Sequence, residues 1–108
     1  MIIVSHRLFL SVGDGEVEID IHIHQPVIGH RCWTCRYETH WPEGRQTRDA
    51  VGHDALQALT LALQMIGADI YSSTYHREGR LRAYEKELGY GFPVASSLRH
   101  LLVGVDAI

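Results

Sequence analysis

One amphipathic segment in the middle of the chain constrains the fold more than any other feature. Its larger apolar residues recur at spacings of three and four, which is the pattern of a helix with a single apolar face. They are Leu56, Leu59, Leu63, Ile66 and Ile70. Asp54 and Gln57 precede them at the spacing of a capping box, and Gly79 follows as a stop signal. We expect one helix from about Ala55 to Arg77, about 34 Å long at about 1.5 Å per residue.

Alternating apolar and polar residues on the N-terminal side of this segment predict strands that have one buried face. Gly13-Asp-Gly15, Pro26 with Gly29, and Pro42-Glu-Gly44 supply the turns. The expected strands are Ile2–Val12, Val17–His24, about Arg31–Trp41 and Arg45–Val51. The apolar face that we expect the helix to cover carries Val17, Ile19, Ile21, Ile23, Trp33 and Tyr37.

The sequence therefore predicts an α+β fold, with an antiparallel meander sheet of about four strands packed on one long helix. A short strand is expected within Arg80–Tyr84, and a short C-terminal helix or turn between Ser96 and Leu102. A chain of 108 residues with 45% hydrophobic and 21% charged residues fits one globular domain, residues 1–108.

The charge distribution argues against nucleic acid as a partner. The formal net charge is -3 and the basic residues are spread along the chain, so no basic stripe is formed. The apolar N-terminus is interrupted by His6 and Arg7 and lacks the features of a signal peptide, and no segment resembles a membrane span. We expect a cytoplasmic protein that does not bind membranes.

Two segments resemble a family of small bacterial α+β domains of unknown function. They are Gln57-Ala-Leu-Thr-Leu-Ala-Leu-Gln-Met-Ile-Gly-Ala-Asp69 and Gly89-Tyr-Gly-Phe-Pro93. The resemblance covers most of the chain and implies a bacterial origin and a compact α+β domain. It brings no catalytic or binding residues with it.

Eight histidines in a chain of this length are the one compositional anomaly. His22 and His24 are one residue apart in an expected strand and project from the same face, an arrangement that strand-borne zinc sites use. His30, Cys32 or His40 is positioned to supply a third ligand. The metal candidates are therefore His22, His24, Cys32 and His40. The alternative is a solvated strand face whose polar positions are histidines.

Cys32 and Cys35 have the spacing of a redox pair or of half a zinc site. Residues three apart on a strand point to opposite faces. We therefore expect Cys35 in the core, Cys32 facing outward, and two separate thiols.

The polar face of the expected sheet is the candidate binding surface, and we call it the outer face. It carries Glu18, Asp20, His22, His24, Thr34, Arg36, Glu38 and His40. A single helix leaves this face uncovered, and an open sheet surface suits a protein partner better than an enzyme's concave site.

The function predicted from these features is a non-enzymatic binding or protein-interaction domain. It is expected to bind a protein partner or to form a homodimer. The most specific form of this hypothesis is an immunity-type protein. The residues expected to bind the partner are Glu18, Asp20, His22, His24, Arg36, Glu38 and His40. The alternatives are a metal-binding or metal-sensing protein that uses His22 and His24, and a small hydrolase or isomerase that uses His40 and Glu38. We also expect binding at the outer face to change with pH between about 5.5 and 8, where histidine titrates.

Overall fold

The computed structural model describes residues 1–94 and 103–107 of the chain. Its contacts divide the chain into two compact units. The first unit is made of Met1–Arg7 and Ile19–Ala62, and the second of Leu8–Glu18 and Leu63–Ile108. The boundary between them falls inside two strands and the long helix. A single domain over residues 1–108 stays a prediction.

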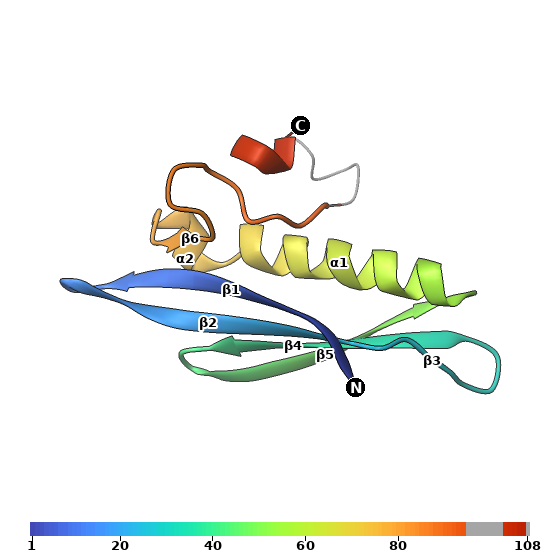
Figure 1. The fold of residues 1–108 in the computed structure, drawn as a ribbon. Helices are drawn as coiled ribbons and strands as arrows, with labels where there is room; N and C mark the ends of the chain where they lie inside the picture. The colour runs from blue at the N-terminus through green and yellow to red at the C-terminus, as the bar shows by residue number, and fades with distance from the viewer. Residues whose placement is uncertain (95–102, 108) are drawn as a thin grey trace. The chain divides into compact units, whose positions relative to one another are not determined.

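The fold is α+β, and its strands form one antiparallel sheet (Figure 1). The strands are β1 (Ile2–Val12), β2 (Gly15–His24), β3 (Val27–Ile28), β4 (Trp33–Trp41), β5 (Gly44–Gly52) and β6 (Leu81–Arg82). Their order is β3-β4-β2-β1-β6, and β5 also pairs with β4. The four long strands are the expected ones in the expected meander order. The count of about four is wrong, because β3 and β6 add two residues each to make a six-stranded sheet.

The helical elements are α1 (Ala55–Tyr71), α2 (Thr74–Arg77) and η2 (Gly104–Ala107), a 3-10 helix. The capping box at the start of α1 is confirmed. Asp54 Oδ1 accepts a hydrogen bond from the Gln57 backbone N–H at 2.7 Å, and Gln57 Oε1 accepts from the His53 N–H at 2.5 Å. Among residues 1–94 and 103–107, no helix has the length and apolar character needed to cross a membrane.

The expected end of the long helix is wrong. Helix α1 stops at Tyr71, and Ser73 adopts an extended conformation, with φ -71° and ψ 149°. The Ser73 hydroxyl accepts a hydrogen bond from the His76 N–H at 3.1 Å, so it caps a second helix, α2. The short C-terminal helix expected between Ser96 and Leu102 lies outside the described residues.

The buried face of α1 in the first unit is made of alanines rather than leucines. Ala58 and Ala62 are completely buried, whereas Leu56, expected on that face, is 73% exposed. A Cβ added to Gly52, at the end of β5, would lie 2.5 Å from the Ala58 backbone N. Small side chains therefore let the helix backbone lie directly against the strand, which larger apolar residues would prevent.

The expected core of the first unit is largely confirmed. Its fully buried strand residues are Ile19, Ile21, Ile23, Cys35, Tyr37 and Thr39. The register pairs Ile21 with Thr39 and Ile23 with Tyr37, so β2 and β4 contribute to one inner face. Figure 1 shows the first half of α1 over that face, which leaves the opposite, outer face of these strands uncovered. Two residues of the expected apolar face are wrong, because Trp33 is only half-buried and Val17, which belongs to the second unit, is 39% exposed.

The first strand buries less of its apolar side than its alternation predicts. Leu8 and Leu10 are buried in the second unit, but Ile2 and Val4 in the first unit are 45% and 49% exposed. The short strand β6, expected within Arg80–Tyr84, pairs with β1 through Leu10 and Leu81.

The second unit brings together the two segments that carry the family resemblance. A Cβ on Gly67 of α1 would lie 2.2 Å from the Pro93 carbonyl oxygen, so the loop crosses the helix where glycine leaves room. Asp106 of η2 fastens the same loop. Its carboxylate accepts hydrogen bonds from the Tyr71 hydroxyl at 2.6 Å and from the Tyr90 and Gly91 N–H groups at 2.7 Å each.

Candidate functional site

The register of β2 and β4 places the polar side chains of the first unit in rows on the outer face. His22 lies directly opposite Glu38, and His40 is two residues further along β4 on the same face. Successive side chains of a strand alternate between faces, so the burial of Ile21, Tyr37 and Thr39 fixes these three polar residues on the other side.

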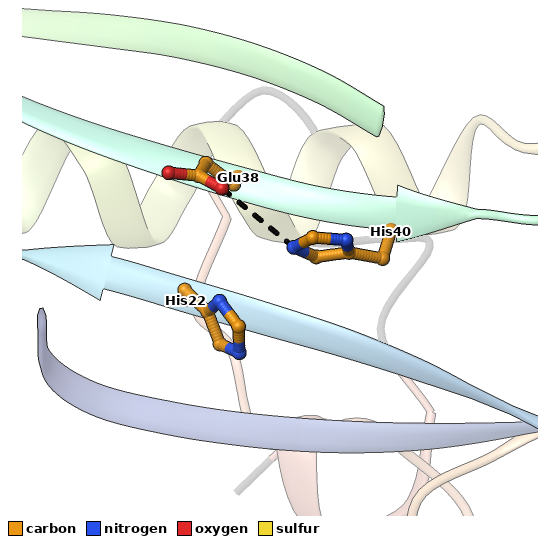
Figure 2. A group of neighbouring side chains, drawn as sticks. All are labelled: His22, Glu38 and His40. Atoms are coloured by element: carbon orange, nitrogen blue, oxygen red, sulfur yellow. Dashed lines mark ion pairs between the residues drawn. The ribbon is translucent and has the colours of Figure 1, made fainter. Parts of the chain in front are cut away.

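Three of these side chains form a compact group. One potential ligand atom from each of His22, Glu38 and His40 lies within 4.8 Å of the other two. The two imidazole rings are 5.0 Å apart between centroids and are tilted by 60°. Figure 2 shows His22 on one strand, with Glu38 and His40 on its neighbour. We call these three residues the His22–Glu38–His40 cluster.

Glu38 is held in place from several directions. His24 Nε2 donates a hydrogen bond to Glu38 Oε1 at 2.7 Å, while His40 Nε2 and Arg45 Nη1 lie 3.6 and 3.7 Å from Oε2. The hydrogen bond from His24, helped by the charges of the same neighbours, lowers the pKa of the Glu38 carboxyl below its ordinary value. Glu38 is therefore an ionised carboxylate at neutral pH.

His40 carries an unsatisfied polar atom at the centre of the cluster. Its Nε2 is buried and has no hydrogen-bond partner among the described residues. The 3.6 Å to Glu38 Oε2 is longer than a hydrogen bond. A buried polar atom without a partner is unfavourable, and a metal ion bound to this nitrogen would remove that penalty.

The donor set fits a transition-metal ion. Imidazole nitrogen and carboxylate oxygen bind zinc at about 2.0 to 2.2 Å, so ligand atoms of a tetrahedral ion lie about 3.4 Å apart. The ligand atoms lie up to 4.8 Å apart and would move closer together by up to about 1.4 Å on binding. A movement of this size is within reach of side-chain rotation and requires no shift of the strands.

The structure brings together only part of the metal set predicted from the sequence. His22 and His40 belong to the cluster, while His24 is outside it and donates a hydrogen bond to Glu38. Cys32 belongs to no potential metal-binding group of the described residues and borders a depression with His30 and His53 instead. The sequence predicts Glu38 as a partner-binding residue and as a candidate partner of His40 in a hydrolase or isomerase, but not as a metal ligand. The sequence signal for this role is the alternation of Glu38 with His40, which matches the alternation of His22 with His24.

The other predicted partner-binding residues are engaged with neighbours in the protein. Asp20 forms an ion pair with Arg7 at 2.7 Å, and Arg36 forms one with Asp49 at 2.8 Å. Both arginines lower the pKa of the carboxyl that they contact. Glu18 belongs to the second unit.

The two cysteines are separate thiols in different environments. Cys35 is buried, and its Sγ donates a hydrogen bond to the His24 carbonyl oxygen at 3.3 Å. Burial raises the pKa of the Cys35 thiol. Cys32 is half-buried and precedes β4. The expected core position of Cys35 is confirmed.

Comparison with protein families places most of the chain in a known family. The family model described as Domain of unknown function (DUF6968) matches residues 4–94. Searches of curated proteins and of solved structures found no significant match.

Proposed function

The chain belongs to this family, whose description assigns no activity, and we propose that it binds a divalent transition-metal ion through His22, Glu38 and His40. The observation that carries the proposal is the convergence of three ligand atoms within 4.8 Å of one another on the outer face. The buried His40 Nε2, which has no hydrogen-bond partner in the described part of the chain, supports it further.

The donor set favours zinc or a neighbouring first-row metal over calcium and magnesium. Two imidazole nitrogens suit zinc, iron, nickel and copper, whereas calcium and magnesium prefer shells made of oxygen atoms. The carboxylate of Glu38 neutralises part of the charge of the ion, which stabilises a divalent ion at a partly exposed site.

Metal analysis of untagged protein tests this proposal. After loading with zinc and desalting, we expect one zinc ion per chain, and we expect the ion to be lost when His22→Ala and His40→Ala are combined. His53→Ala is the matched control, because it removes an exposed histidine of the same unit outside the cluster. Circular dichroism of each variant checks that it is folded. Zinc retained by the double variant, or absent from the folded wild-type protein, would contradict the proposal.

A protein-interaction role for the outer face is the second candidate, supported by an apolar row at one end of it. Val27 and Val51 flank Thr34 in register and are 57% and 54% exposed. Association of two copies through this row would remove both valines from water. Sedimentation over a range of concentrations tests it. A dimer that is lost in Val51→Asp supports the role, and a monomer at every concentration contradicts it.

A further inference from the structure

The three residues of the His22–Glu38–His40 cluster approach a metal ion from one side only. All three project from the same face of two paired strands, so their donor atoms occupy the half of the coordination sphere that faces the sheet. His24, the next histidine along β2, is not part of the group and donates its hydrogen bond to Glu38 Oε1. No other described residue belongs to the group, so within the described part of the chain the half that faces away from the sheet has no protein ligand.

Charge decides which kind of ligand suits that position. A divalent ion with two neutral imidazoles and one carboxylate has a net charge of about +1, and a positively charged open centre binds anions or hydroxide. Arg45, 3.7 Å from Glu38, adds positive charge beside it. The Asp20 carboxylate, which pairs with Arg7 and interacts with His22 and His40, offsets part of this positive charge, so the bound ion itself supplies the main attraction for an anionic ligand.

The surface beside His22 has room for such a ligand. Ser5, His6, Arg7, Asp20 and His22 line an open depression of about 340 Å³. His22 belongs both to this depression and to the cluster, so a ligand in the depression is adjacent to the metal position. Asp20 holds Arg7 at the same depression through a 2.7 Å hydrogen bond from Arg7 Nε.

We propose that the metal centre keeps an open coordination position that binds a small oxyanion, a carboxylate or a phosphate, seated in the depression beside His22. This inference rests on the proposed function, because it needs the ion in place. It adds the class of ligand and the direction from which the ligand enters. A centre with three protein ligands and an exchangeable fourth position is the arrangement found in catalytic rather than structural zinc sites.

Cobalt-substituted protein tests the inference, because the visible absorption of Co²⁺ reports its coordination. Sodium acetate is titrated against the cobalt form, with sodium perchlorate at equal ionic strength as the non-coordinating control. We expect a saturable change of the cobalt bands with acetate and none with perchlorate. In Arg7→Gln we expect unchanged cobalt binding and about tenfold weaker acetate binding. Arg48→Gln, an exposed arginine that does not line the depression, is the matched control and leaves both unchanged.

The outcomes separate the two proposals. Absence of cobalt bands in folded protein overturns the proposed function and, with it, this inference. Cobalt bands that do not respond to acetate overturn the open position alone. An acetate response that is the same in Arg7→Gln and in the wild-type protein overturns the placement of the anion in the depression.

Discussion

Replacing His24 by alanine tests whether this residue positions a metal ligand or is itself a ligand. The hydrogen bond from His24 Nε2 to Glu38 Oε1, at 2.7 Å, is the shortest contact of that carboxylate, since His40 and Arg45 lie 3.6 and 3.7 Å away. Without it the Glu38 side chain regains rotational freedom, which binding must then remove. Loss of a residue that orients a metal ligand typically weakens affinity about 10- to 100-fold, or about 1.4 to 2.8 kcal/mol.

The assay is a competition titration of zinc against a chromophoric chelator at fixed pH. His24→Gln is the informative second variant, because a glutamine amide also donates a hydrogen bond to a carboxylate, and we expect it to restore part of the affinity. A change of less than twofold in His24→Ala would show that His24 does not position Glu38. A loss of zinc affinity as large as that in His22→Ala would show that His24 is itself a ligand, which would contradict the assignment of the three ligands.

Three further predictions concern the second unit. Asp106→Asn should lower the free energy of unfolding by about 2 kcal/mol in denaturant titrations. The amide nitrogen of asparagine replaces one carboxylate oxygen and cannot accept a hydrogen bond, so one of the three bonds to this side chain is lost. Burial raises the pKa of Tyr90 to about 12. The free energy of unfolding should therefore stay constant below about pH 10, the ordinary pKa of tyrosine, and should fall as the pH rises from 10 towards 12. Tyr90→Phe should weaken that dependence, and an equally steep loss in the variant would refute it. Gly67→Ala should lower the melting temperature despite the higher helix propensity of alanine, about 1 kcal/mol, because its Cβ would lie 2.2 Å from the Pro93 carbonyl oxygen. Gly15→Ala, with nothing within 4 Å of its Cβ, is the control.

The parts of the fold that could be predicted from the sequence are those that depend on local sequence patterns. The alternation around Ile21 and the capping box at Asp54 each depend on residues a few positions apart, and both proved correct. The end of α1 was missed because Ser73 caps a new helix inside a segment that continues the helical pattern. The buried face was misplaced because close approach to Gly52 favours Ala58 over a leucine, and only the packed structure shows that approach.

The sequence predicts the sheet face on which the candidate site lies, but not which residues of that face come together. Alternation alone places His22 and His40 on the same side of the sheet. Which residue stands opposite His22 depends on the pairing register, and a shift by one residue would have exchanged Glu38 for a residue of the other face. Cys32 was included because its place just before β4 is not visible in the sequence pattern.

The arrangement of the His22–Glu38–His40 cluster argues for a metal site rather than for histidines that happen to face water. On a solvated face each polar atom is free to bond to water, yet His40 Nε2 is buried and has no hydrogen-bond partner among the described residues, with Glu38 Oε2 3.6 Å away. A buried polar atom without a hydrogen bond is unfavourable in the free protein. Glu38 is likewise fixed beforehand, with Oε1 bonded to His24 and Oε2 turned towards His40. An ion that binds to the cluster would therefore provide His40 Nε2 with a partner and would lose little entropy in ordering its ligands. Both effects favour tight binding even on an open sheet face.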